Sequence, residues 1–286
     1  MKGELFLVAT PIGNLKDISE RAIESLNQAD IILCEDTRRT RALLSHLGIR
    51  GKKLISFNEH NQDRRIPQIL AQLEQGKKIA LASDAGTPAI SDPGGKLVEL
   101  AHKKGIKITP IPGASAITTA LSASGFPAER FLFLGFLSAK AGERRKLLEK
   151  YKDFPETIVI FEAPHRIEKT IKDLIDVLGN REACLCRELT KAFEEIRRTN
   201  LSELLDHIKT NPPKGEITLI LEGAEKEISL DFNELEKKLK DIITEKLAQG
   251  KKLKEIVEEI AESYEISKNK IYKLALKIKN SLEKNS

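Results

Sequence analysis

Short apolar runs alternate with amphipathic segments along the first part of the chain. Runs typical of buried strands fall at residues 5–9, 31–34, 54–57, 79–82 and 106–109. Between them, apolar residues recur at helical spacing over 66–73 and 93–103, and Ser19 is placed to cap a further helix. This alternation predicts a mostly parallel sheet with helices on both faces.

After a predicted helix from Ala114 to just before Gly125, the same pattern begins again. Strands are predicted at 131–136, 157–161, 183–187 and 217–221, with helices at 144–151, 167–178 and 201–208. From Asp231 onward strand signals vanish, and helices are predicted at 233–247, 253–263 and 268–282. We therefore predict an α/β protein with α/β domains at 1–122 and 123–226 and a helical, helix-turn-helix-like extension at 227–286.

Composition narrows the classes of function. Tryptophan is absent and aromatic residues make up 5% of the chain, so stacking surfaces for single-stranded RNA are scarce. The longest apolar stretch, residues 131–137, is too short to cross a bilayer, and residues 1–4 do not begin a signal peptide. The three cysteines lie in strand-like runs without a ligand set for zinc. We expect a cytoplasmic protein with no metal and no membrane partner.

The net charge of +5 is concentrated near the C-terminus. Residues 268–286 contain six lysines and one acid, Glu283, so this segment carries the whole surplus. On a helix its lysines would lie opposite an apolar stripe that includes Ile271 and Ile278. Such a face is either solvated or in contact with phosphates. If it contacts RNA, the residues expected to do so are Lys270, Lys273 and Lys277.

Two loops rich in glycine and proline follow predicted strands. One runs from Ser83 to Gly94, and the other is the Pro110 to Gly113 turn, which is followed at once by a helix start. Such loops let the backbone approach a ligand closely at the end of a sheet. Neither has the glycine pattern of a dinucleotide-binding loop or of a Walker sequence. They indicate a nucleotide-like cofactor that is neither NAD nor ATP.

Seven motifs occur in order across the two predicted α/β domains. They are LFLVATPIGNLKDIS (5–19), CEDTRRT (34–40), SDAGTPAISDPG (83–94), PIPGASA (110–116), FEAPHRI (161–167), CRELTKAFEE (186–195) and KGEITLILEG (214–223). Together they resemble the small-subunit ribosomal RNA cytidine 2′-O-methyltransferases, a branch of the tetrapyrrole-methylase superfamily. The resemblance is strong over roughly residues 1–225, and the helical tail is similar to the C-terminal extension of that family.

The resemblance implies S-adenosylmethionine bound in the cleft between the two domains, without metal. The reaction implied is methyl transfer to the ribose 2′-hydroxyl of a cytidine in the decoding region of 16S ribosomal RNA, in the small ribosomal subunit, by a homodimer. Transferred by motif, the cofactor-binding residues are Pro11, Ile12, Ser83, Asp84, Ala85, Gly86, Thr87, Ser115, Ala116, Phe161, Gly215, Glu216 and Ile217. Ser83-Asp84-Ala85 departs from the Gly-Asp-Pro of members that act on small molecules, which favours the RNA branch.

A ribose hydroxyl is a weak acid, so a base or a cation beside the oxygen should help the reaction. Candidates in strand-end loops are Glu35 and Asp36, Glu162 with His165 and Arg166, Glu188 with Lys191, and Asp84. Each has a structural alternative: Asp36 as the cap of a helix near Thr37, Asp84 as support for its own loop, His165 as a helix-start residue and Glu188 with Lys191 as a surface pair. We predict catalytic roles for Glu162 and Lys191, and then for Asp36.

Arginines in the same loops are candidates for contact with RNA. Arg38, Arg39 and Arg166 are expected to meet phosphates, since strand-end loops seldom gather arginine without an anion. Two other functions stay open: methylation of a tetrapyrrole or a similar small metabolite, and RNA binding without catalysis. The basic tail and the arginine loops argue against the first alternative, and the intact glycine-rich loops argue against the second.

Overall fold

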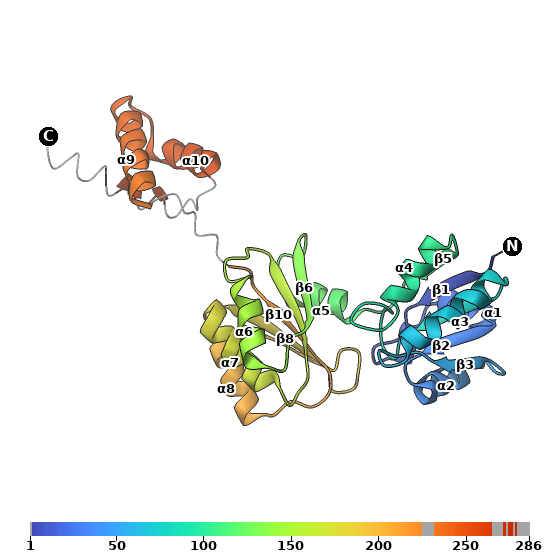
Figure 1. Ribbon diagram of the computed structural model, residues 1–286. Helices are drawn as coiled ribbons and strands as arrows, with labels where there is room; N and C mark the ends of the chain where they lie inside the picture. Colours follow the sequence, from blue (N-terminus) through green and yellow to red (C-terminus); the bar gives the residue numbers. More distant parts are fainter. Residues whose placement is uncertain (1, 225–231, 265–270, 273, 277, 279–286) are drawn as a thin grey trace. The chain divides into compact units, whose positions relative to one another are not determined.

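A computed structural model describes residues 2–224, 232–264, 271–272, 274–276 and 278 (Figure 1). The chain divides into two compact units, Met1–Glu225 and Lys226–Ser286. The first unit contains two sheets with their helices, and the described part of the second is helical. The predicted α/β class with a helical C-terminal region is therefore confirmed.

The first sheet is parallel throughout. Its strands are β1 (Glu4–Val8), β2 (Ile31–Cys34), β3 (Lys53–Ser56), β4 (Lys78–Ala82) and β5 (Lys107–Ile111), in the order β3-β2-β4-β1-β5. Side chains alternate between the two faces, so Leu5 belongs to one hydrophobic core cluster and Phe6 to the other. All five strands end at the same edge of the sheet, where the glycine-rich loops lie.

Helices cover both faces of this sheet, as predicted (Figure 1). They are α1 (Glu20–Gln28), α2 (Thr37–His46), α3 (Gln62–Glu74) and α4 (Gly95–Lys103), preceded by a short 3-10 turn, η1 (Leu15–Asp17). Residues of α3 and α4 pack in one core cluster, and residues of α1 and α2 pack in the other. Ser19 caps α1 as predicted, since its side chain accepts a hydrogen bond from Ala22 N at 3.2 Å.

The second sheet is mixed. Its strands are β6 (Phe131–Phe136), β7 (Thr157–Glu162), β8 (Glu182–Arg187), β9 (Glu195–Asn200) and β10 (Ile217–Leu221), in the order β6-β7-β10-β8-β9. Only β6 and β7 run parallel, and the other neighbours are antiparallel. The pattern of apolar residues does not predict β9, because this edge strand is charged and largely exposed.

Helices also cover the second sheet on both faces. The helices α6 (Ala141–Glu149), α7 (Ile167–Leu178) and α8 (Leu201–Thr210) pack on one face, and α5 (Ala116–Ser124) packs on the other. Ile117 and Leu121 of α5 contact Val159 and Ile220 of the sheet within one core cluster. Since α5 lies largely before the predicted boundary at 122 yet packs on the second sheet, that boundary stays a prediction.

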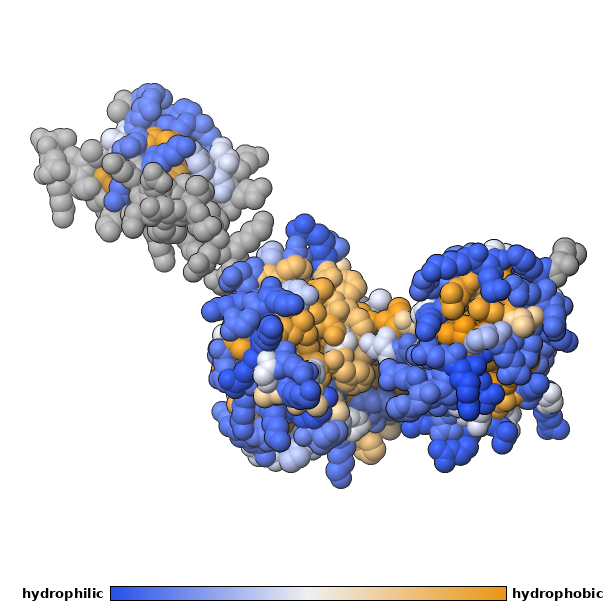
Figure 2. All heavy atoms as spheres, viewed as in Figure 1, coloured by the Kyte–Doolittle hydropathy of each residue, from blue (hydrophilic) through white to orange (hydrophobic). Residues whose placement is uncertain are grey.

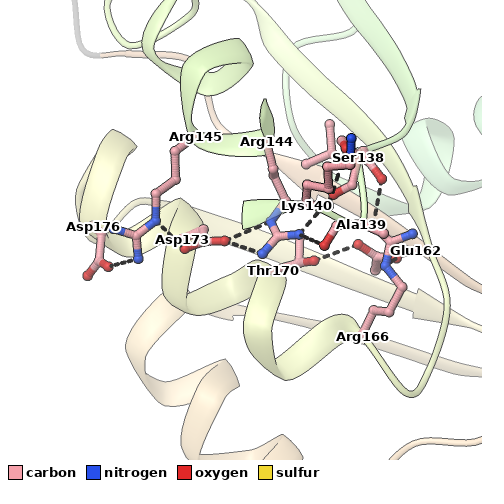
Figure 3. A network of polar contacts seen from close by, with 11 residues as sticks. Ser138, Ala139, Lys140, Arg144, Arg145, Glu162, Arg166, Thr170, Asp173 and Asp176 are labelled. Atoms are coloured by element: carbon pink, nitrogen blue, oxygen red, sulfur yellow. Dashed lines mark hydrogen bonds and ion pairs between the residues drawn. The ribbon is translucent and has the colours of Figure 1, made fainter. Parts of the chain in front are cut away.

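A buried ion pair joins α6 to α7 (Figure 3). Arg144 Nε donates to Asp173 Oδ2 at 2.7 Å, and the two side chains are only 5% and 6% exposed. Arg144 also donates to the carbonyl oxygen of Ser138 at 2.9 Å, and Asp173 accepts a second bond from Arg145. Each buried charge therefore has its partners, as burial of ions requires.

In the second unit, α9 (Phe232–Ala248) and α10 (Leu253–Ser263) agree with the helices predicted there. Leu239 and Ile243 of α9 pack with Ile256 and Ile260 of α10, and residues Ile271, Ala275 and Ile278 are buried in the same cluster. Lys270, Lys273 and Lys277 lie outside the described residues. Across the part of the chain that the structure describes, no helix has the length and apolarity needed to cross a membrane.

Candidate functional site

A cavity of about 450 Å³ lies at the carboxyl ends of the first sheet, and the second sheet supplies its other wall. Loops after β1, β2, β4 and β5 contribute the first wall, and the ends of β6 and β7 with the start of β10 contribute the second. Its volume falls in the range of small-molecule sites, roughly 300–1,000 Å³. The edge of a parallel sheet at the carboxyl ends of its strands is where open α/β folds bind ligands.

Most of the predicted cofactor-binding residues meet in this cavity. Eleven of the thirteen line it: Ile12, Asp84, Ala85, Gly86, Thr87, Ser115, Ala116, Phe161, Gly215, Glu216 and Ile217. Pro11 and Ser83 do not. Pro11 lines a neighbouring cavity, and Ser83 is buried beneath the loop, where its hydroxyl donates to Gly86 O at 3.2 Å and accepts from Ala85 N at 3.1 Å. Ser83 supports the loop from within.

Hydrogen bonds connect the glycine-rich loops to one another. Thr10 and Gly86 exchange two backbone hydrogen bonds, of 2.9 and 3.0 Å, which join the loop after β1 to the loop after β4. The hydroxyl of Thr87 donates to Ala114 O at 3.3 Å and connects the loop after β5. The first wall of the cavity is therefore held together by two main-chain hydrogen bonds and one from the side chain of Thr87.

Gly86 and Gly113 have different structural roles. Gly86 lines the cavity with a φ of +86°, in the left-handed region that favours glycine. Gly113 does not line the cavity, and a Cβ there would lie 2.9 Å from the Cβ of Ala9. Close approach to the ligand was predicted for both glycines. It stays a prediction for Gly86, which lines the cavity, and gains no support for Gly113. At Gly113 the space is needed by the end of β1.

Phenylalanine rings form part of the second wall. Phe136 and Phe161 both line the cavity, with ring centroids 5.6 Å apart, and Phe133 packs against Phe161 at 4.9 Å. Phe136 is 58% exposed. The low aromatic content of the chain had suggested few stacking surfaces, yet these rings gather beside the cavity. They offer a face for a flat ring.

Glu162 lines the cavity, but its carboxylate is buried and fully engaged (Figure 3). It accepts hydrogen bonds from Ala163 N at 2.8 Å and Thr170 Oγ1 at 2.5 Å, and Arg166 Nε lies 3.2 Å from Oε1. These contacts hold the turn between β7 and α7. The catalytic role of Glu162 stays a prediction, and its geometry favours support of the cavity wall.

Lys191 lies in a network with two glutamates. Its Nζ donates to Glu188 Oε1 at 2.8 Å and to Glu216 Oε2 at 3.1 Å. Partial burial lowers the pKa of Lys191, but the hydrogen bonds and charges of the two glutamates outweigh it and raise that pKa overall. Lys191 is therefore a cation and a poor base. It lines neither cavity, and its catalytic role stays a prediction.

The Lys191 network lies where the part of the first unit built on the second sheet contacts the part built on the first sheet. Glu188 Oε1 also accepts from Glu216 N at 2.9 Å, which holds the segment that lines the cavity. A Cβ at Gly13 would lie 2.5 Å from Cγ of Lys191, so the loop after β1 packs directly on this segment. Glu188 and Thr190 have positive φ values of 51° and 65°, and such strained backbone is found preferentially at functional sites.

Asp36 caps α2, which is the structural alternative that its sequence position offered. Its Oδ1 accepts from Arg38 N at 2.8 Å, and its carboxylate forms an ion pair with the Arg38 guanidinium at 2.7 Å. The hydrogen bonds from Arg38 hold the pKa of Asp36 well below its usual range. Asp36 is thus a weak base, and its catalytic role stays a prediction without support from this geometry.

The three arginines proposed as phosphate contacts differ in their availability. Arg39 lines the cavity, is 68% exposed and lies 3.6 Å from Asp84 Oδ2. Arg38 is exposed but paired with Asp36. Arg166 is already engaged by neighbours around the second sheet: its Nη2 donates to Leu137 O at 2.5 Å, and its Nε pairs with Glu162. Of the three, Arg39 has the geometry that best suits an incoming anion.

Two acidic residues of the cavity were not predicted to bind the cofactor. Burial, followed by the charge of Glu35, raises the pKa of Asp92 to about 7, although a hydrogen bond from Ser83 opposes the shift. Burial also raises the pKa of Glu35; a hydrogen bond from the backbone of Asp84 opposes this shift, and the charges of Asp84 and Glu59 add to it. Asp92 lies within the glycine-rich loop from Ser83 to Gly94, in its SDPG end, and this position was the sequence signal that could have identified it.

Metal ligation gains no support from the described residues, where no group of three histidine, cysteine or acidic side chains has suitable geometry. Cys184 and Cys186 are buried with their sulfurs 3.8 Å apart, on the face of the second sheet that α5 covers.

Comparison with known proteins identifies the family. Residues 4–205 match the model of the Tetrapyrrole (Corrin/Porphyrin) Methylases. Proteins named ribosomal RNA small subunit methyltransferase I are 50% identical over 222 residues in Halalkalibacterium halodurans (78% of this chain, 76% of that protein) and 47% identical over 223 residues in Thermotoga maritima (78% and 100%). One from Synechocystis sp. is 42% identical over 277 residues (96% and 98%). The chain belongs to the tetrapyrrole methylase family.

Within that family the chain groups with the ribosomal RNA small subunit methyltransferase I proteins, as its motifs predicted. Membership makes it a methyltransferase, and its methyl donor is S-adenosylmethionine. Solved structures with the same fold include diphthine synthase (TM-score 0.62, 17% identity, 77% of this chain and 90% of that one). Cobalt precorrin-4 methyltransferase is another (TM-score 0.58, 19% identity, 77% and 94%). At these identities the likeness supports the tetrapyrrole methylase fold alone.

Proposed function

We propose that this protein transfers the methyl group of S-adenosylmethionine to the ribose 2′-hydroxyl of a cytidine in the decoding region of 16S ribosomal RNA. The observation that carries the proposal is the meeting of eleven motif residues around one cavity, in a chain 40–50% identical to proteins named ribosomal RNA small subunit methyltransferase I. The partner that follows from this function is the small ribosomal subunit, and the compartment is the cytoplasm.

The cavity fits S-adenosylmethionine in chemistry as well as in size. Gly86 gives the ligand access to backbone, Phe161 supplies an aromatic wall, and Glu35, Asp84 and Asp92 place carboxylates where a cationic cofactor would lie. The sulfonium supplies an activated methyl group when it is bound. The protein then has to align the acceptor oxygen with the methyl carbon and exclude water.

The two alternative functions are supported less well. A tetrapyrrole substrate would not require the exposed Arg39 beside the cavity or the lysine-rich tail. RNA binding without catalysis would not require a cavity that retains the cofactor motifs and their loop-to-loop hydrogen bonds. The relatives that match most of this chain carry the ribosomal RNA name.

We also propose that the protein is a homodimer that associates through β6. This strand has the sequence FLFLGF, forms one edge of the second sheet and is partly exposed along its length. Phe131 and Phe136 are 41% and 58% exposed, and Figure 2 shows hydrophobic surface gathered over this region. An exposed apolar edge strand favours pairing with another chain.

Methylation of defined substrates tests the proposed function. Purified protein is incubated with labelled S-adenosylmethionine and small ribosomal subunits that lack the modification. We expect label at one cytidine, on the ribose. Naked 16S ribosomal RNA and a tetrapyrrole serve as parallel substrates. Label on the tetrapyrrole alone, or on a base instead of a ribose, would contradict the proposal.

Asp92 is expected to make cofactor binding depend on pH. Because its pKa is about 7, raising the pH from 6 to 8 ionises Asp92 and adds a negative charge to the cavity. S-adenosylmethionine carries a sulfonium cation that the demethylated product lacks. The affinity ratio of cofactor to product should therefore rise with pH, by up to about tenfold if binding the cation shifts this pKa by one unit.

Calorimetric titration of both ligands at pH 6, 7 and 8 measures this ratio. Asp92→Asn should remove the pH dependence, because an amide does not ionise. Asp63→Asn, at an exposed residue paired with Lys96 outside the cavity, should leave it unchanged. A ratio that stays flat in the wild-type protein would show that Asp92 does not sense the sulfonium.

The lysines of the tail are expected to dock the protein on RNA. Replacing Lys270, Lys273 and Lys277 with glutamine should make the slope of log binding constant against log salt less negative by about 2–3, because each phosphate contact contributes about 0.7–0.9. Substitution is a better test than truncation here. Removing residues 265–286 would also remove Ile271 and Ala275 from a hydrophobic cluster.

Binding to the small subunit at several salt concentrations measures the slope. The matched control replaces Lys103, Lys104 and Lys107 with glutamine, which removes the same charge from surface residues paired with acids in the first unit. If the two triple variants had equal slopes, the loss of net charge alone would explain the change in salt dependence, which would contradict docking through the tail.

A further inference from the structure

A second cavity, of about 300 Å³, opens at the carboxyl ends of β1, β2 and β4. Pro11 and Leu15 line it from the loop after β1, and Ala42 and Leu43 line it from α2. Arg39 and Asp84 line both this cavity and the cofactor cavity. The two cavities therefore share a wall made of one cation and one carboxylate.

The lining of the second cavity matches the chemistry of a nucleotide. Its apolar sides suit the two faces of a base, and Leu15, at 42% exposure, is an apolar side chain open to such a contact. Arg39 is exposed and only loosely paired with Asp84, at 3.6 Å. A guanidinium in this position suits a phosphate, with which it forms charge-assisted hydrogen bonds.

We propose that this second cavity binds the acceptor nucleotide of the RNA, with Arg39 on its phosphate and Asp84 at its 2′-hydroxyl. The proposal rests on the proposed RNA methylation and assigns the acceptor site within it. A hydroxyl at the shared wall lies between the two cavities, which is where an acceptor must meet a methyl donor. A nucleotide turned out of its RNA strand reaches such a pocket, as in other enzymes that modify nucleotides.

Asp84 is better placed to act as a base than the acids favoured by the sequence. Its Oδ1 accepts a hydrogen bond from Asp36 N at 3.1 Å, while among the described residues Oδ2 has only the weak pair with Arg39, at 3.6 Å. The carboxylates of Glu162 and Asp36 are instead engaged by strong hydrogen bonds. Movement of Arg39 toward a phosphate would free Oδ2.

The transfer balances with this assignment. The 2′-oxygen forms a bond to the methyl carbon as the carbon–sulfur bond breaks, and the bonding pair remains on sulfur, which becomes a neutral thioether. The hydroxyl proton passes to Asp84 and leaves to water after the reaction. General-base catalysis of this kind contributes about 100- to 10,000-fold.

Filling the second cavity tests the site. Ala42→Phe should raise the KM for small ribosomal subunits at least tenfold. It should leave the affinity for S-adenosylmethionine unchanged, since Ala42 lines the second cavity and not the cofactor cavity. Ser45→Phe, on the same helix and lining neither cavity, is the control. Leu15→Glu, at an exposed residue of the opposite wall, should weaken RNA binding by repelling phosphate. Unchanged cofactor affinity also shows that each variant is folded.

Asp84→Asn tests the base. The amide keeps an acceptor for Asp36 N but takes up no proton, so single-turnover methylation at saturating cofactor should slow at least 100-fold and lose its dependence on pH. A wild-type rate of single-turnover methylation in Asp84→Asn would show that Asp84 is not the base. A wild-type KM for small ribosomal subunits in both Ala42→Phe and Leu15→Glu would show that the second cavity does not bind the acceptor nucleotide. Both readings require an active wild-type enzyme. If the wild type transfers no methyl group to the subunit, the proposed function itself has failed.

Discussion

Replacing Asp173 with alanine should lower the free energy of unfolding by about 3–5 kcal/mol. The substitution leaves the guanidinium of Arg144 buried without its counter-charge, at a side-chain exposure of 5%. Breaking a buried ion pair costs more than the pair contributes, because the remaining charge stays desolvated. Urea unfolding monitored by circular dichroism measures the effect.

Asp176 offers a matched control for this prediction. It pairs with Arg145 at 2.8 Å on the same face of α7, but both side chains are about half exposed, at 49% and 55%. Asp176→Ala should therefore change the free energy of unfolding by less than about 1 kcal/mol. A similar small loss for Asp173→Ala would mean that water reaches Arg144 in solution.

Gly86→Val should weaken binding of S-adenosylmethionine by about 10- to 100-fold. The φ of +86° forces a β-branched residue into a strained conformation, which costs about 1–3 kcal/mol, and the loop relieves that strain by moving away from the cavity. The same movement breaks the paired hydrogen bonds between Gly86 and Thr10. Calorimetric titration measures the affinity.

Two other glycines separate the causes of this effect. Gly48 has a similar φ of +73° and no atom within 4 Å of its Cβ position, so Gly48→Val adds backbone strain away from the cavity and should leave affinity unchanged. Gly113→Val should lower thermal stability through its clash with Ala9. Wild-type affinity in Gly86→Val would remove this loop from the cofactor site.

The strands and loops that carry the site could be predicted because local pattern determines them. The run from Ile79 to Ala82 is apolar and ends at Ser83, so both the strand and the loop were visible in the sequence. The charged strand Glu195–Asn200 was missed, because an exposed edge strand lacks the alternation that reveals a half-buried one. The mixed direction of the second sheet also depends on pairing between distant segments.

Side-chain roles were harder to predict than positions. Glu162 and Lys191 were correctly placed at or after the ends of strands. The sequence did not show that Thr170 and Arg166 bind the carboxylate of Glu162. It also did not show that two glutamates bind the ammonium group of Lys191. The pKa of Asp92 depends on its burial and on its approach to Glu35, which is 57 positions away in the chain. Such through-space terms appear only once the fold is known.

The two edges of the second sheet differ, and the difference limits how copies of this chain assemble. The β6 edge is apolar, whereas the β9 edge carries Glu195, Arg197 and Arg198, which discourage strand pairing. Head-to-tail joining of β6 to β9, which would extend into a filament, is therefore disfavoured. In the proposed homodimer, pairing of β6 with β6 about a two-fold axis would cover the apolar edge of the second sheet in both copies, so this edge would not recruit a third copy.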